Sequence, residues 1–281
     1  MPTIADRRRA FRELHREGCF VLPNPWSVGT ARYLQHLGFR AIATTSSGAA
    51  FSMGFPDNDR AVSLDAMLAH IRSLVEASDI PVNADFASGY AHEPEQVAAN
   101  VRRCVETGVA GLSVEDLTGD PARPFYPLEV ATRRVAAARS AIDAAGGDVI
   151  LTGRAEWKLA GPGDLDEALR RLRAYADAGA DCLYAPGLRS RQEIAVAVAA
   201  VAPKPVNVLV STASGITVGD LAALGVRRIS VGSSLARVAW GAFIRAARTI
   251  ASEGRFDAFA DAVPFPELNA FFRDDLAQRT S

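Results

Sequence analysis

Two carboxylates end apolar runs of this sequence, and a third stands in a turn-like stretch. Asp85 closes the run in "VNADFASGYA" (82–91), Glu115 closes "GLSVE" (111–115), and Asp57 lies in "GFPDND" (54–59). A carboxylate is costly to bury without a partner, and several carboxylates at one place repel unless a cation lies among them. Oxygen ligands suit Mg²⁺ or Mn²⁺. These residues therefore predict a divalent cation at Asp85, held directly or through water.

Each of these residues also has a structural interpretation. A lone Asp after a strand is more often a helix N-cap or a turn former, and Asp57 taken by itself fits a turn. Arg154 closes another apolar run, "VILTGR" (149–154). Its guanidinium is either a buried counter-ion of Glu115 or Glu156 or a clamp for an anionic substrate, and the sequence favours neither interpretation.

Eight short β-rich runs alternate with longer segments of helical periodicity. The runs are nearly all apolar, as expected of parallel strands that helices cover, and several of the helical segments stop at a Gly just before the next run. The expected strands are 20–24, 41–46, 82–86, 111–116, 149–156, 182–186, 206–210 and 228–233. Eight such units without a break in composition predict one (β/α)₈ TIM barrel over residues 1–281, whose chemistry lies at the carboxyl ends of the strands.

A doubly wound sheet is the alternative fold. Such a sheet usually has a Gly-rich phosphate loop after its first strand, and the corresponding stretch here, "NPWSVGTAR" (24–32), is not of that kind. The barrel is therefore the preferred prediction.

Composition narrows the class of protein. Of the 281 residues, 49% are apolar and 22% charged, and 31 basic residues nearly balance 32 acidic ones. This balance predicts no nucleic-acid partner and no attachment to an anionic membrane. No apolar run reaches the length of a spanning helix, and the charged start of the chain does not resemble a signal peptide. Cys19, Cys104 and Cys182 are scattered, which predicts reduced thiols and a cytoplasmic setting. The four histidines are expected mainly at the surface.

The C-terminal segment, residues 234–281, contains six Phe residues. That much aromatic surface is costly to leave in water. The segment is expected to pack either on its own barrel or on a neighbouring subunit, and its pattern leaves both open.

Five motifs in order resemble the phosphoenolpyruvate mutase/isocitrate lyase superfamily over about residues 11–275. They are "TSSGAAFSMGFPD" (45–57), "VNADFASGYA" (82–91), "GVAGLSVEDLTGD" (108–120), "ILTGRAEWKLAG" (150–161) and "AYADAGADCLYAPG" (174–187). The resemblance implies a barrel whose last helix is swapped between subunits, and usually a homotetramer built of two swapped dimers. It also implies Mg²⁺-dependent enolate chemistry on a small-molecule carboxylate substrate.

The resemblance implies roles for single residues. Asp85 would be the protein group nearest to Mg²⁺, while Asp57 and Glu115 would hold its waters. Arg154 would clamp the anionic end of the substrate. The groups implied for the rest of the substrate are a carboxylate-binding turn and a pocket wall, namely Ser47, Gly48, Ala49 and Asn207.

Three departures from the superfamily pattern restrict the reaction. Ala87 replaces the second Asp of the metal strand, "TGDPARPFYPLE" (118–129) lacks the Cys of the lyase loop, and Pro186 stands where relatives carry Glu or His. What remains is a platform for C–C cleavage or decarboxylation of a small 2-oxo or 2-hydroxy acid such as oxaloacetate, with water, Tyr90 or Tyr126 as proton source. The alternatives are P–C bond chemistry on a phosphonopyruvate-like substrate and a non-catalytic metabolite-binding barrel.

Overall fold

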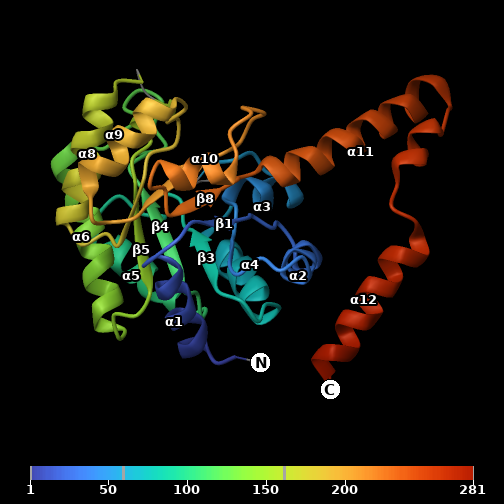
Figure 1. Cartoon of the computed structure of the whole chain (residues 1–281), viewed down its shortest axis with the longest axis horizontal. Helices are drawn as coiled ribbons and strands as arrows, with labels where there is room; N and C mark the ends of the chain where they lie inside the picture. The colour runs from blue at the N-terminus through green and yellow to red at the C-terminus, as the bar shows by residue number, and fades with distance from the viewer. Residues whose placement is uncertain (1, 59–60, 161–162, 281) are drawn as a thin grey trace. The chain divides into compact units, whose positions relative to one another are not determined.

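The computed structural model describes residues 2–58, 61–160 and 163–280, and its centre is an eight-stranded parallel sheet rolled into a barrel (Figure 1). Every expected strand contains an observed one, so the predicted TIM barrel is confirmed. The strands are β1 Phe20–Leu22, β2 Ile42–Ala43, β3 Val82–Asp85, β4 Gly111–Glu115, β5 Ile150–Arg154, β6 Cys182–Tyr184, β7 Val206–Leu209 and β8 Arg228–Ser230.

The barrel closes between its first two strands without a regular ladder. The sheet order runs β1-β8-β7-β6-β5-β4-β3-β2, and a single backbone hydrogen bond, from Ala43 N–H to Pro23 O at 2.9 Å, joins β2 to the segment after β1. Asn24 closes the gap with its side chain. Its amide donates to Thr44 O at 2.9 Å, and its oxygen accepts from the backbone N–H groups of residues 231 and 232.

The register brings the candidate site residues to one rim. Glu115 pairs with Arg154, Arg154 pairs with Tyr184, and Asp85 ends the strand next to β4. Because parallel strands end at the same edge of a sheet, these side chains meet at the carboxyl mouth of the barrel.

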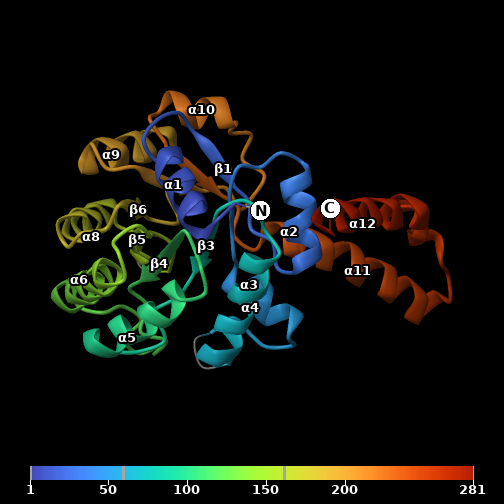
Figure 2. The same cartoon turned by 90° about the horizontal axis from the view of Figure 1, so that it is seen from below.

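Ten helices of the described barrel unit accompany the strands, and Figure 2 shows most of them as a ring around the sheet. Their apolar residues recur at helical spacing and cover the outside of the strands. The helices are α1 Ile4–Leu14, α2 Val28–His36, α3 Ser46–Ser52, α4 Leu64–Glu76, α5 Pro94–Val105, α6 Leu128–Ala144, α7 Trp157–Ala160, α8 Leu165–Asp177, α9 Arg191–Val201 and α10 Val218–Ala223.

Helix α1 plugs the amino end of the barrel. Phe11 and Leu14 form an apolar cluster with residues of the strands, among them Phe20 and Ile150. The fit is close at Gly111 of β4, where a Cβ atom would come within 2.6 Å of the Phe11 ring. His15, expected at the surface, is instead buried, with its ring edge-on to Phe11. His15 is the C-cap of this charged helix, and the cap turns into the apolar cluster.

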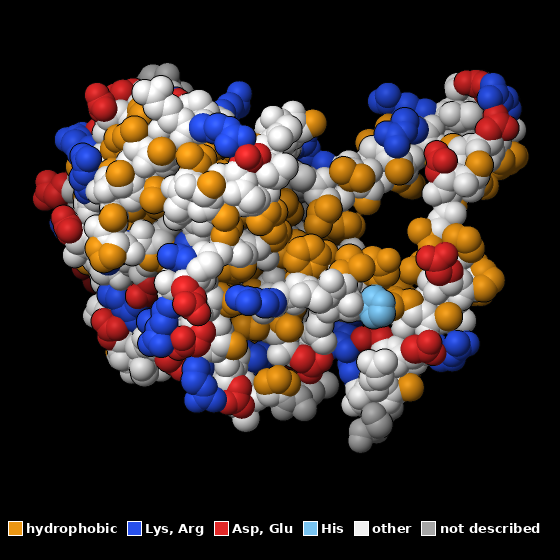
Figure 3. Space-filling view, in the orientation of Figure 1, with side chains coloured by type: hydrophobic (Ala, Val, Ile, Leu, Met, Phe, Trp, Pro, Cys, Tyr) orange, Lys and Arg blue, Asp and Glu red, His pale blue; other side chains and the backbone are white. Residues whose placement is uncertain are grey.

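The chain divides into two compact units, residues 1–234 and 235–281. The second unit holds most of α11 (Ser234–Glu253), the 3₁₀ turn η1 (Asp257–Asp261) and α12 (Phe265–Thr280). Many of its apolar side chains are exposed, including Val238, Phe243 and Phe265, and apolar side chains gather along this unit in Figure 3. Over the described residues, the three cysteines are free thiols and no helix has the length and apolar character to cross a membrane.

Candidate active site

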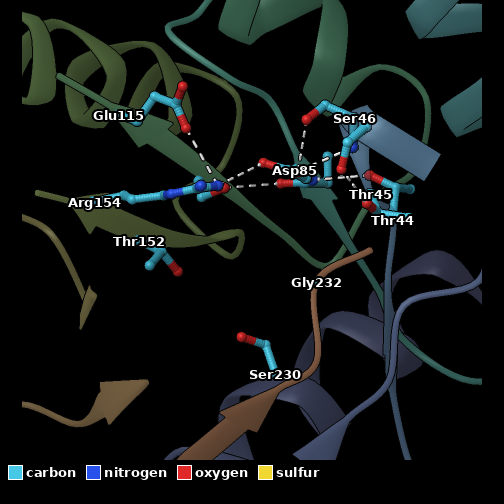
Figure 4. A network of polar contacts seen from close by, with 12 residues as sticks. Thr44, Thr45, Ser46, Asp85, Glu115, Thr152, Arg154, Ser230 and Gly232 are labelled. Carbon is cyan, nitrogen blue, oxygen red and sulfur yellow. Dashed lines mark hydrogen bonds and ion pairs between the residues drawn. The ribbon is translucent and has the colours of Figure 1, made fainter. Parts of the chain in front are cut away.

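Arg154, the last residue of β5, is the centre of the mouth. Its Nη1 lies 3.1 Å from Asp85 Oδ1 and 3.2 Å from Glu115 Oε2, and its Nε donates to Glu156. Figure 4 shows Arg154 and Asp85 pointing toward one another from their two strands, with Glu115 above them. In this structure Arg154 is therefore a counter-ion of these carboxylates.

Among the described residues, three carboxylates contact the one guanidinium of Arg154. Burial by itself would lower the pKa of Arg154, but Glu115 and Glu156 raise that pKa well above its ordinary value. Burial raises the pKa of Glu156, and the neighbouring charge of Asp116 adds to this effect while Arg154 opposes it. Three carboxylates thus share one guanidinium, and the mouth favours a further cation.

Asp85 is held on its other side by the start of α3. Ser46 donates to Asp85 Oδ2 twice, from its backbone N–H and from its hydroxyl, at 3.0 Å in both cases. The Ser46 hydroxyl also lies 3.4 Å from Asp57 Oδ1, so it joins the exposed Asp57 to the cluster. Ser46 therefore belongs to the site, although the sequence motif pointed to its neighbour Ser47.

The predicted carboxylate-binding turn is the first turn of α3. Thr45 is the N-cap, and its hydroxyl accepts from the Gly48 N–H at 3.2 Å. The Ala49 N–H donates to Thr45 O at 3.0 Å, and the Ser47 hydroxyl lies 3.3 Å from the Thr45 hydroxyl. The backbone N–H groups of Gly48 and Ala49 are thus both engaged by Thr45, as expected at the start of a helix.

Asp116, which follows Glu115, joins the ends of β4 and β5 to α8. Its buried carboxylate accepts from Arg171 at 2.9 Å, from the Tyr175 hydroxyl at 2.6 Å and from the Glu156 N–H at 2.9 Å. These contacts come from α8 and from the segment after β5. Asp116 is therefore a structural residue that holds Glu156, and through it Arg154, in place.

The loop after β3 has a strained backbone. Ala87 and Tyr90 have φ angles of 45° and 56°, in the left-handed region that side chains disfavour. The loop is held by Arg134, which donates to Ala91 O at 2.6 Å and to Ser88 O, and by Asn100, which donates to Tyr90 O at 3.3 Å. Buried hydrogen-bond donors thus hold the loop in a strained conformation, which is common for loops at functional sites.

Tyr126, one of the two predicted proton sources, lies in the loop before α6. Its hydroxyl is 2.6 Å from His92 Nδ1, and the Arg134 guanidinium stacks 4.0 Å from its ring centroid. Tyr90, the other, packs against Phe86 with ring centroids 5.3 Å apart. Both tyrosines come from loops that follow the strands of Asp85 and Glu115.

Asn207 lies inside the barrel. Its side chain is 1% exposed, donates to the Ser230 hydroxyl at 2.9 Å and accepts from Arg228 at 2.8 Å. Asn207 would therefore act on a substrate only indirectly, through its hydrogen bond to Ser230. Arg228 was not singled out by the sequence, although a basic residue opening an apolar strand (residues 228–233) was a signal for it.

A divalent cation fits the donor set at the mouth. Asp85, Glu115 and Asp57 supply only carboxylate oxygens, and their charge exceeds that of Arg154. Across residues 2–58, 61–160 and 163–280, no three His, Cys, Asp or Glu side chains come close enough to enclose a metal ion. Mg²⁺ does not need such a cage, because it keeps several waters and binds through one or two carboxylates.

Known proteins resemble this chain over most of its length. A model of the family described as phosphoenolpyruvate phosphomutase matches residues 11–251. The solved structure of a "putative lyase/mutase" from Burkholderia cenocepacia J2315 is 47% identical, with a TM-score of 0.90 over 96% of both chains. An uncharacterized protein of Mycobacterium tuberculosis is 33% identical over 97% of this chain and 99% of its own. An oxaloacetate decarboxylase of Paraburkholderia xenovorans is 27% identical over 67% of this chain and 64% of its own.

Proposed function

The chain belongs to the phosphoenolpyruvate phosphomutase family of carbon–carbon lyases and mutases, and from this premise we propose that it is a Mg²⁺-dependent lyase. Its substrate is a small 2-oxo or 2-hydroxy carboxylic acid, and its reaction is decarboxylation or C–C cleavage of an oxaloacetate-like molecule. The observation that carries the proposal is the Arg154 guanidinium held between Asp85 and Glu115 at the mouth. The decarboxylase among its relatives acts on a substrate of this class.

In this proposal the carboxylates divide the work of holding the metal. Asp85 would bind Mg²⁺, and Asp57 and Glu115 would hold its waters; Mn²⁺ would suit the same oxygens. When bound, the metal supplies Lewis-acid stabilisation of an enolate. Ala87 contributes no carboxylate, so fewer groups hold the ion, and the ion is held more weakly than in a strand with two Asp residues.

Arg154 exchanges partners when substrate binds. Its Nη1 leaves a carboxylate for the anionic end of the substrate, while its Nε stays on Glu156. Among the described residues three carboxylates contact Arg154, and a bound Mg²⁺ would compensate the charge of the one that is released. Ser47, Gly48 and Ala49 meet the substrate carboxylate, and Gly48 gives up its bond to Thr45 to do so. Asn207 supports the wall through Ser230.

The proton for the enolate comes from water, Tyr90 or Tyr126. The loop 118–129 has no thiol to serve as acid. Tyr126 is the better placed of the two tyrosines for proton relay, because its hydroxyl already shares a hydrogen bond with His92.

Phosphonopyruvate-type P–C chemistry is the second candidate, and the family's name is the observation that favours it. Such a substrate carries an extra negative charge and calls for additional cations. Lys158 is paired with Glu193 at 2.8 Å, and Arg123 lies 3.5 Å from Asp120. Each of these cations has an acidic partner outside the Asp85–Glu115–Glu156 cluster, which favours the carboxylate substrate.

We also propose that residues 234–281 pack on a neighbouring subunit in a homotetramer of paired, swapped dimers. The support is the exposed apolar surface of this segment. Phe265 is 80% exposed and Val238 70% exposed, more than a monomer usually leaves in water.

Thermal unfolding with a ligand panel tests the proposed function. Ligands that bind the native state raise the melting temperature. Mg²⁺ with oxalate or oxaloacetate is expected to raise it more than Mg²⁺ alone. A larger shift with phosphonopyruvate would favour the second candidate, and no shift with any of them would favour a barrel without this activity.

A further inference from the structure

A buried arginine crosses the inside of the barrel below the mouth. Arg228, the first residue of β8, is 2% exposed. Its Nε donates to Asn207 on β7 at 2.8 Å, its Nη2 to the Thr152 hydroxyl on β5 at 2.9 Å, and its Nη1 lies 3.3 Å from His15 Nε2 in α1. Contacts to two other strands and to the plugging helix are possible only from within the barrel.

This guanidinium has no acidic partner in the part of the chain that the structure describes. Its three partners are an amide, a hydroxyl and an imidazole, and none of its ion-pair distances to Asp or Glu falls within 4.0 Å. By contrast, buried Arg171 is paired with Asp116 at 2.9 Å. A guanidinium stays charged in proteins, so Arg228 is a buried positive charge without a counter-ion.

His15 does not change this balance at neutral pH. Burial and the charge of Arg228 lower the pKa of His15 to about 3, so the ring is neutral. Its Nδ1 lies 2.7 Å from Phe11 O and must donate to that carbonyl, which leaves Nε2 as an acceptor for Arg228.

The charge of Arg228 lies just below the candidate site. Thr152, which accepts from Arg228, is two residues before Arg154 on the same face of β5. Ser230 accepts from Asn207 and shares a hydrogen bond with Tyr184, over whose ring the Arg154 guanidinium lies at 5.1 Å. Figure 4 shows Thr152 below Arg154, and Ser230 farther below, at β8.

We propose that Arg228 is a fixed positive charge beneath the substrate that sets the preference of the site for dianionic over monoanionic carboxylates. The inference rests on the proposed function. In an interior shielded from water a charge acts over more than one layer of side chains, attracting a dianion about twice as strongly as a monoanion and repelling a metal cation. Arg228 thereby offsets part of the excess of carboxylates at the mouth, so that an anion can enter it.

The test uses neutral and charged replacements in the full-length protein. Arg228→Met removes the charge, Arg228→Gln removes it but keeps an amide donor for Asn207 or Thr152, and Arg228→Lys keeps it. Arg32→Met is the matched control, because Arg32 is a buried arginine outside the barrel that donates to Ala77 O at 2.7 Å. Calorimetry would give three dissociation constants for each variant: Mg²⁺ alone, and oxalate and glyoxylate at saturating Mg²⁺.

The affinities for the two carboxylates and for Mg²⁺ are expected to change in opposite directions. Neutral replacement weakens oxalate binding about tenfold and glyoxylate binding about threefold, and it strengthens Mg²⁺ binding severalfold. Arg228→Lys and Arg32→Met leave the ratio of oxalate to glyoxylate affinity unchanged. A merely structural role would weaken all three ligands together, and that result, or an unchanged ratio, would overturn the inference. Wild-type protein that binds neither carboxylate would overturn the proposed function with it.

Discussion

At the scale of single residues, Arg154 fits both the role of a counter-ion and that of a substrate clamp. A guanidinium at a barrel mouth is stable only when carboxylates surround it, and the carboxylates are stable together only because of it. Asp85, Glu115 and Glu156 all reach it, so it is a counter-ion in this structure. The planar fork that makes these pairs is also the group that grips a substrate carboxylate at two points.

Removing the Asp85 carboxylate tests the metal assignment. Asp85→Ala is expected to abolish stabilisation by Mg²⁺ and binding of oxalate. The fold should survive, with a change of about 1–2 kcal/mol in the free energy of unfolding, because Arg154 keeps its bonds to Glu115 and Glu156. Calorimetry that finds unchanged oxalate affinity in this variant would exclude Asp85 as the metal ligand.

Replacing the planar guanidinium of Arg154 by an ammonium group tests its role as the substrate clamp. Arg154→Lys keeps the charge but cannot hold Glu156 and a carboxylate at once, so the turnover rate should fall about 10²–10³-fold. Steady-state kinetics with saturating Mg²⁺ measures this effect. Activity within a factor of three of wild type would mean that a point charge suffices and that the fork has no role in the reaction.

The sequence predicted which residues lie at the mouth more accurately than it predicted the residues that contact them. Asp85, Glu115 and Arg154 were predicted from the ends of apolar runs, where parallel strands place side chains together. Ser46 was not separated from Ser47, because which of two adjacent residues faces Asp85 depends on where α3 begins. Arg228 was missed because its partners lie far away in the chain, and its place at the start of an apolar run was the only local signal that we identified.

At the scale of elements, periodicity located all eight strands but overestimated their lengths. The run 149–156 contains a strand of five residues, Ile150–Arg154, since the residues beyond it turn away into the loop that carries Glu156. The weak closure between β1 and β2 was not predictable, because it depends on the side chain of Asn24 rather than on a strand pattern.

The ion pair between α7 and α9 gives the barrel a pH dependence. Lys158, helped by the backbone N–H groups of Arg189 and Ser190, lowers the pKa of Glu193 from 4.5 to about 2. This stabilisation is fully present above about pH 4.5 and is lost as the pH falls toward 2. Lys158→Met should therefore move the midpoint of acid unfolding to higher pH, as followed by circular dichroism.

The pair of Arg191 and Asp220, 2.8 Å apart between α9 and α10, provides the control, because its cation is 60% exposed whereas Lys158 is 16% exposed. Solvent screens exposed pairs strongly, so Arg191→Met should shift the acid midpoint less. Equal shifts for the two variants would show that the Lys158 pair has no special weight.

At the scale of the whole molecule, the C-terminal unit exposes many large apolar side chains. The run 265–272, "FPELNAFF", exposes Phe265 and is predicted to bury its aromatic rings on another subunit. Deletion of residues 255–281 should yield monomers or aggregates, as measured by light scattering with size-exclusion chromatography. A well-behaved oligomer of unchanged size would place the segment outside the assembly interface.

The central claim is a metal–enolate site without a dedicated thiol acid, and product analysis tests it most directly. Purified protein would be given oxaloacetate and isocitrate separately, with coupled assays following pyruvate and glyoxylate release. Losing a general acid typically costs about 10²–10⁴ in rate, so isocitrate cleavage should be negligible, while decarboxylation leaves an enolate that water can protonate. We expect release of pyruvate from oxaloacetate that depends on both Mg²⁺ and Arg154. Brisk glyoxylate release from isocitrate would contradict it.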